Sequence, residues 1–94
     1  MTTKITAAEA RKIAGPTDEE IINDNLNYAY GRIREAADKK ARRALLTNDF
    51  WTHGGYESSK NWKQAVKTLE EDGFKVTFFY EERQFVNMYT VAEW

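Results

Sequence analysis

The sequence contains no cysteine, one proline and one histidine among its 94 residues. Without cysteine, disulfide bonds, thiolate metal sites and cysteine nucleophiles are all excluded. No apolar run approaches the roughly 18 residues that indicate a membrane span, and residues 1–14 lack the apolar stretch of a signal peptide. We therefore expect a cytoplasmic protein with no membrane association.

Patterns of catalytic or metal-binding residues are equally scarce. His53, with Asp49 and Glu57, offers one imidazole and two carboxylates, a weaker ligand set than metal sites normally use. Ser58 and Ser59 have no second histidine to activate them, and no Gly-x-Ser-x-Gly elbow is present. No glycine-rich phosphate loop follows a predicted strand. The sequence predicts no enzyme, no metal site and no cofactor.

The size and composition are those of one globular domain. A length of 94 residues is close to the usual size of a domain, with room for a single core. The balance of 41% hydrophobic and 31% charged residues argues against disorder. We therefore treat residues 1–94 as one domain.

Capping signals delimit the predicted helices. Thr6 and Glu9 form a capping box, and the helix that follows should end at Ala14, before Gly15-Pro16. The same signal at Thr17 starts a long helix, about Asp18 to Asp38, with an apolar stripe of Ile22, Leu26, Ala29, Ile33 and Ala36. A third helix, about Lys60 to Asp72, begins after Ser58 or Ser59 and has a core face of Trp62, Ala65, Val66 and Leu69.

The residues between the second and third helices are harder to assign. Ala44 to Leu46 reads as a short buried strand, although a continued helix fits nearly as well. Thr47 to Glu57 reads as a loop, with Gly54-Gly55 as a tight turn.

The C-terminal residues predict a β-hairpin. Apolar residues alternate along residues 74–80, residues 81–84 form a polar turn, and residues 85–94 form the second strand. A turn centred on Glu82-Arg83 pairs Val76 with Tyr89 on the core face. It likewise pairs Tyr80 with Phe85 and Phe74 with Val91. The predicted fold class is α+β, with three helices packed on one face of a small antiparallel sheet dominated by this hairpin.

In that register the other face of the hairpin carries an apolar strip. Contiguous exposed apolar residues often mark interaction sites, so the strip predicts a contact with a second copy or with another protein. Its residues are Phe79, Val86, Met88 and Trp94. The alternative is that Leu45, Leu46 and the Phe50-Trp51 segment fold over the strip and bury it within the monomer.

A basic run follows the long helix, comprising Lys39, Lys40, Arg42 and Arg43. Cations at a helix C-terminus complement the helix dipole, and this structural interpretation is preferred to an anion or nucleic-acid site. A winged-helix interpretation would place Glu81 and Glu82 at the wing tip, where they would repel phosphates. The net charge of −1 also lacks the basic excess of nucleic-acid binders.

The opening residues Ile5 to Pro16 resemble the start of small, uncharacterised proteins encoded by tailed bacteriophages. The resemblance continues in Ile33 to Ala37, in Asp72 to Val76 and in the final Trp94. It implies a phage origin and brings no active site with it. One departure is the missing glycine after the long helix, which puts the first strand in doubt.

Together these observations favour a non-enzymatic accessory protein that binds a host or phage protein, of the host-takeover or anti-defence type. The alternative is a nucleic-acid-associated regulator that uses the basic run Lys39–Arg43.

Overall fold

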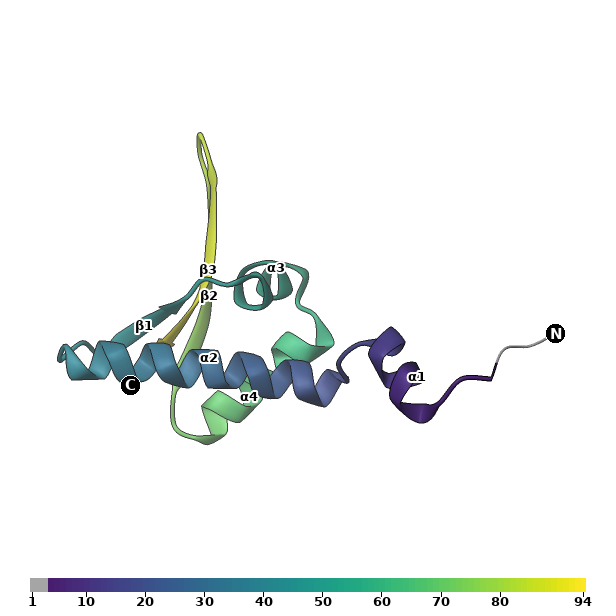
Figure 1. The fold of residues 1–94 in the computed structure, drawn as a ribbon. Coiled ribbons are helices and arrows are strands. Elements are labelled where there is room, and N and C mark those ends of the chain that lie inside the picture. The colour runs from purple at the N-terminus through teal and green to yellow at the C-terminus, as the bar shows by residue number, and fades with distance from the viewer. Residues whose placement is uncertain (1–3) are drawn as a thin grey trace.

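The computed structural model describes residues 4–94, which form four helices and a three-stranded antiparallel sheet (Figure 1). The strand order is β1-β3-β2, so the last strand is the central one. The predicted α+β class, with a C-terminal hairpin, is confirmed. The elements in chain order are α1 (Ala7–Ala14), α2 (Asp18–Asp38), β1 (Arg43–Leu46), α3 (Asp49–Glu57), α4 (Lys60–Glu71), β2 (Lys75–Glu82) and β3 (Val86–Glu93).

The helices begin where the capping signals predict. The hydroxyl of Thr6 accepts from the amide of Glu9 at 3.2 Å, and that of Thr17 accepts from Glu20 at 3.1 Å. Gly15 has a φ of +79° and ends α1. No residue of α1 is buried, and this helix lies apart from the others in Figure 1. The sheet is therefore covered by α2, α3 and α4, which contact it and one another.

The segment predicted as a loop, Thr47 to Glu57, contains a helix instead. The side chain of Asn48 caps α3 by accepting from the amide of Trp51 at 3.1 Å. Two glycines inside a helix cost about 1 kcal/mol each relative to alanine. Trp51 is fully buried by this conformation, and removing a buried tryptophan costs about 3–5 kcal/mol. Burial of one side chain thus outweighs the local preference for a turn.

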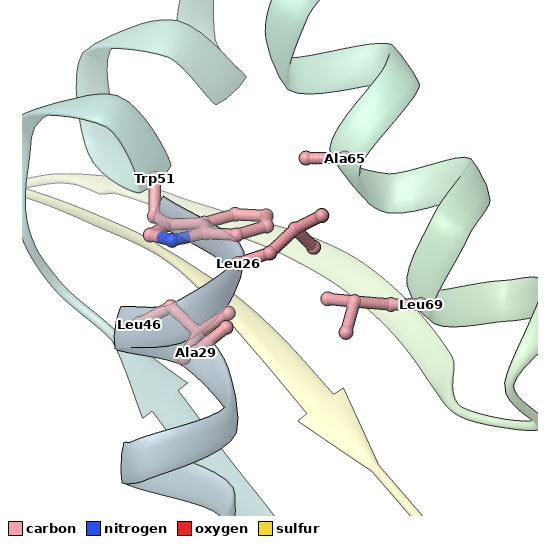
Figure 2. Close-up of a cluster of buried hydrophobic side chains, with 6 residues drawn as sticks. All are labelled: Leu26, Ala29, Leu46, Trp51, Ala65 and Leu69. Atoms are coloured by element: carbon pink, nitrogen blue, oxygen red, sulfur yellow. The ribbon is translucent and has the colours of Figure 1, made fainter. Parts of the chain in front are cut away.

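The core combines alanines with larger apolar side chains (Figure 2). Leu26 and Leu69 are buried as predicted, and Trp51 lies between them and β1. The buried cluster comprises Leu26, Ala29, Leu46, Trp51, Ala65 and Leu69. The other apolar residues predicted for the helix-side core pack against this cluster and are only partly buried, namely Ile22, Ile33, Trp62, Val66, Phe74 and Val76. Phe78 is also partly buried, and its ring packs edge-on against that of Trp62.

The predicted register of the hairpin is wrong. Val76 pairs with Ala92 instead of Tyr89, a shift of three residues (92 − 89), because the connection is the loop Arg83–Phe85. An odd shift moves every side chain of one strand to the opposite face. Thr90 and Ala92 therefore face the helices, and Tyr89 faces away.

Thr90 is the one fully buried polar residue that the central strand presents to the helices. Its hydroxyl accepts from the indole Nε1 of Trp62 at 3.1 Å and donates to the carbonyl of Trp51 at 2.6 Å. One hydroxyl thereby joins β3 to both α3 and α4.

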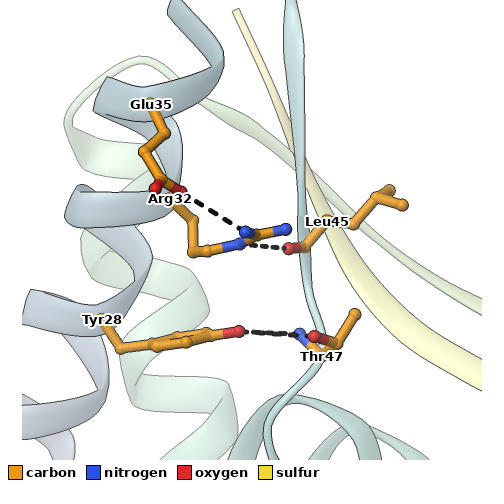
Figure 3. Close-up of polar contacts among 5 residues, drawn as sticks. All are labelled: Tyr28, Arg32, Glu35, Leu45 and Thr47. Carbon is orange, nitrogen blue, oxygen red and sulfur yellow. Dashed lines mark hydrogen bonds and ion pairs between the residues drawn. The ribbon is translucent and has the colours of Figure 1, made fainter.

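The short first strand is confirmed as β1, and α2 covers its outer edge (Figure 3). Nε of Arg32 donates to the carbonyl of Leu45 at 3.3 Å, and the hydroxyl of Tyr28 accepts from the amide of Thr47 at 3.4 Å. Unpaired edge groups invite pairing with another chain. The side chains of α2 occupy these groups and so protect this edge.

Gly55 and Gly31 form a matched pair for testing the packing of α3. A Cβ at Gly55 would lie 2.5 Å from two ring atoms of Phe78, whereas nothing lies within 4 Å of a Cβ at Gly31. We predict that Gly55→Ala lowers stability by about 1–3 kcal/mol through overpacking. Gly31→Ala should raise stability by up to about 1 kcal/mol through helix propensity. Thermal unfolding followed by circular dichroism checks both, and equal shifts of the two variants would contradict the close packing.

The Thr90 hydroxyl is tested by an isosteric change. Thr90→Val keeps the shape but leaves Trp62 without its acceptor, so we predict a loss of about 1–3 kcal/mol. Thr77→Val, at an exposed position of β2, should change stability by less than about 0.5 kcal/mol. Urea denaturation of the two variants measures the difference, and a Thr90→Val protein as stable as the parent would refute the role given to this hydroxyl.

Candidate functional site

The hairpin of β2 and β3 projects well beyond the helices (Figure 1). The molecule measures 60 × 33 × 21 Å, with a Cα radius of gyration of 16.7 Å. A compact domain of this length has a radius of gyration of about 12 Å. The difference comes from α1 and from the outer part of the hairpin, residues 80–88, called the arm below.

A shallow hollow lies where the arm meets α3. The ring of Tyr56 in α3 stacks on that of Tyr80 in β2, with 5.3 Å between centroids and 30° between planes. Val86 and Met88 of β3 share this side of the hairpin with Tyr80. We call the hollow the notch, and its lining residues are His53, Tyr56, Glu57, Tyr80, Val86 and Met88.

The apolar side chains at the notch are largely open to solvent. Tyr56 is 60% exposed, Val86 55% and Tyr80 42%, and Phe85 at the tip of the arm is 81% exposed. Tyr80, Phe85 and Val86 lie on the arm, and Tyr56 lies beside them at the end of α3. Exposed apolar side chains that lie together often mark an interaction site, whereas single ones scattered over the surface do not.

The polar groups around the notch are mainly acidic. Glu57 lines it, and Glu82 lies beside Tyr80 on the same side of the hairpin, whereas Glu81 lies on the opposite side and pairs with Arg83. The hydroxyl of Tyr80 donates to Oε2 of Glu82 at 3.1 Å. This hydrogen bond, followed by desolvation and the charge of Glu82, raises the pKa of Tyr80 above its ordinary value. The carboxylates of Glu57 and Glu82 give the notch a negative rim.

His53 lies at the side of the notch without the partners of a metal site. Its Nδ1 lies 3.3 Å from the hydroxyl of Thr52 and 3.8 Å from a carboxylate oxygen of Asp49. Among residues 4–94, no three or more metal-ligating side chains gather closely enough to hold an ion. None of the helices formed by those residues is long and apolar enough to cross a membrane.

The four residues predicted as one partner-binding strip lie in three places, which corrects that part of the prediction. Phe79 is on the face away from the helices, where its ring stacks on Tyr89 at 4.8 Å. Val86 and Met88 line the notch on the opposite side. Trp94 packs edge-on against Phe74. The cause is the odd shift in register, which separates β3 residues from the β2 residues assigned to their face.

The alternative, that neighbouring residues bury the strip, is also wrong for Phe79. Leu46 and Trp51 are buried on the helix side of the sheet, with the core cluster. Leu45 lies on the same face as Phe79, beside Val91 on the neighbouring strand, and is 37% exposed. The face that carries Phe79 therefore has no covering segment among the described elements.

Sequence reasoning missed Tyr56, Tyr80 and Phe85. Tyr56 fell in the segment predicted as a loop, and Tyr80 was assigned to the core. Their exposure depends on how far the hairpin extends past α3, which no local pattern encodes. The high content of aromatic residues, 14% of the chain, was the signal that some rings would remain outside a core of this size.

The basic run lies at the turn after α2. Lys39 is the C-cap residue, Lys40 has a φ of +64°, and Arg43 begins β1. All four side chains are exposed, and within residues 4–94 none is paired with a carboxylate. Lys39, Lys40, Arg42 and Arg43 are thus presented to solvent on the side of the molecule away from the arm.

Comparison with known proteins found no matching family model, no matching curated protein and no matching solved structure.

Proposed function

We propose that this protein is a non-enzymatic accessory factor that binds another protein through the notch and the arm. The observation that carries the proposal is the exposure of Tyr80, Phe85 and Val86 on a hairpin that projects from the core, next to the exposed ring of Tyr56 in α3. Aromatic and methionine side chains are enriched at the centres of protein interfaces. Burying such side chains contributes about 25 cal/mol per Å² of apolar area.

The charges around the notch define the kind of partner. Glu57 and Glu82 form its rim, and Arg83 is already paired with Glu81. Complementary charge at the rim steers association and rejects partners of like charge. The partner segment therefore presents one or two apolar side chains, with lysine or arginine on either side.

The resemblance to small phage proteins supports a search for this partner among host and phage proteins. An accessory factor of the host-takeover or anti-defence type acts by occluding its target. Such a role requires an exposed surface rather than a catalytic centre, and a projecting arm with apolar side chains provides one.

A second candidate function is nucleic-acid binding by the turn after α2. The observation in its favour is that Lys39, Lys40, Arg42 and Arg43 are exposed without carboxylate partners in the described part of the chain. Four cations are few compared with the 6–10 phosphate contacts that give strongly salt-dependent binding. Protein binding at the notch is therefore the preferred function.

The notch is tested with synthetic peptides whose central tryptophan or leucine is flanked by lysine and arginine. We predict that the wild-type chain binds these peptides and not versions flanked by glutamate. The double variant Tyr56→Ser, Val86→Ser should weaken binding by about 30-fold, because a hot-spot residue contributes about 2 kcal/mol or more. Fluorescence anisotropy measures the dissociation constants.

The matched control is Ile13→Ser, which removes another exposed apolar side chain, 78% exposed on α1. This variant should bind the basic peptides like the wild type. Equal binding of basic and acidic peptides, or an unchanged affinity in the notch variant, would count against the proposal.

The second candidate is tested by replacing Lys39, Lys40 and Arg42 together with glutamine. We predict that the wild-type chain shows no measurable affinity for a random-sequence DNA duplex at about 50 mM salt. The triple variant should keep its affinity for the basic peptides. DNA binding that weakens steeply with added salt and disappears in the triple variant would favour the nucleic-acid regulator instead.

A further inference from the structure

The strand order β1-β3-β2 places β2 at one edge of the sheet. In an antiparallel strand, successive residues direct their backbone N–H and C=O groups alternately to the two sides. The amide of Trp94 donates to the carbonyl of Arg42 at 3.0 Å, so even-numbered residues of β3 point toward β1 and odd-numbered ones toward β2. Odd-numbered residues of β2 lie opposite odd-numbered residues of β3. The even-numbered residues of β2 therefore direct their backbone groups outward, and they are Val76, Phe78, Tyr80 and Glu82.

The two edges of the sheet differ in how these outward groups are satisfied. On β1 the same alternation points the carbonyl of Leu45 outward, followed by the amide of Thr47, and the side chains of Arg32 and Tyr28 in α2 bond to both. On β2, no hydrogen bond formed within residues 4–94 reaches the outward backbone groups. A row of free N–H and C=O groups with the spacing of a strand is complementary to the backbone of another extended chain.

The free edge of β2 passes the notch. Tyr80 lines the notch and Glu82 belongs to its rim, and both have outward backbone groups. Phe78, the preceding outward residue, is half-buried on the same side of the hairpin. A chain that pairs with this edge therefore places every second side chain beside the notch while its backbone bonds to β2.

We propose that the partner segment binds as an added β-strand, antiparallel to β2 along its free edge; this inference rests on the proposed function of the notch. Both strand pairs in the sheet are antiparallel, and antiparallel pairing is slightly more stable per residue than parallel pairing. The ligand is thus an extended peptide rather than a helix. Backbone hydrogen bonds hold it, and the side chains beside the notch select its sequence.

Antiparallel pairing fixes the order of side chains in the partner. Directly opposite residues of an antiparallel pair share a face of the sheet. Alternate residues of the partner, read from its N-terminus, therefore lie beside Glu82, Tyr80 and Phe78. A cation complements the carboxylate, and apolar side chains complement the two rings. The partner segment thus carries lysine or arginine first and then two apolar residues, each separated from the next by one residue of any kind.

Two peptides of identical composition test the direction of the added strand. One has lysine, tryptophan and valine in that order, separated by single threonines, and the other has the reverse order. We expect the first to bind about fivefold more tightly or better, because reversal in an antiparallel strand replaces the cation beside Glu82 by valine. Fluorescence anisotropy gives both dissociation constants, and equal affinities would overturn the antiparallel arrangement.

N-methylation of the first peptide tests the backbone hydrogen bonds. The partner residues opposite Tyr80 and Phe78 direct their own N–H groups to β2. Methylating the amides of the tryptophan and the valine should weaken binding by about tenfold or more, because two hydrogen bonds are lost. The matched control carries the methyl groups on the two threonine amides, which face away from β2. It should bind like the unmethylated peptide.

Hydrogen exchange measured by NMR tests the edge in the chain itself. Without peptide, the amides of Phe78 and Tyr80 should exchange faster than those of Thr77 and Phe79, which point toward β3. Saturation with the first peptide should slow exchange at Phe78 and Tyr80 by about tenfold or more. Slow exchange at all four amides of the free chain would overturn the free edge, whatever the peptides do.

The outcomes separate this inference from the proposed function. If both methylated peptides bind equally well and the variant Tyr56→Ser, Val86→Ser weakens both, the notch is a binding site and the added strand is refuted. If no peptide binds, both proposals are refuted. Selective loss with methylated tryptophan and valine, together with slowed exchange at Phe78 and Tyr80, would establish strand addition.

Discussion

The hydroxyl of Thr90 is the contact on which the arrangement of this protein depends. It lies on the central strand, is fully buried, and bonds at once to the indole of Trp62 and to the carbonyl of Trp51. A buried polar group without a partner costs about 1–3 kcal/mol. The indole Nε1 of Trp62 therefore needs an acceptor on the strand. The observed alignment of β3 against the helices places the hydroxyl of Thr90 at that position.

That alignment decides what the rest of the hairpin displays. With Thr90 and Ala92 facing the helices, Val86 and Met88 point to the same side farther out, where α3 ends and the notch begins. Val91 and Tyr89 then face the other way, beside Phe79. The alignment that buries Thr90 thus places Val86 and Met88 on one side of the hairpin and Val91 and Tyr89 on the other.

Small residues where the helices meet the sheet make this arrangement possible. Ala29, Ala65 and Ala92 are fully buried, and Gly55 allows the ring of Phe78 to lie against α3. The helices consequently sit close to the sheet and cover only its inner part. The buried residues of the sheet lie in β1 and in the part of the hairpin beside the helices, while the arm carries exposed apolar side chains. The core and the proposed binding surface therefore use different residues of the same strands.

The sequence by itself determined the features that rest on local interactions. Thr6, Thr17 and Ser59 cap their helices because a hydroxyl reaches an amide three residues away in the chain. The alternating apolar residues after Gly73 likewise identified both strands of the hairpin, since the period of two is a local property. Of the candidate site, the sequence predicted Val86 and Met88 but assigned them to the face turned away from the helices, whereas they lie on the helix side of the hairpin.

Tertiary structure alone decided α3, the register and the site. Gly54-Gly55 favours a turn locally, and α3 forms because it buries Trp51 against residues distant in the sequence. Both faces of β3 carry apolar residues, so alternation could not select between them. The observed choice is favoured by the hydrogen bonds of the Thr90 hydroxyl to Trp51 and Trp62, 39 and 28 residues away along the chain. Contacts over such separations depend on how the helices pack on the sheet, and no local pattern encodes them.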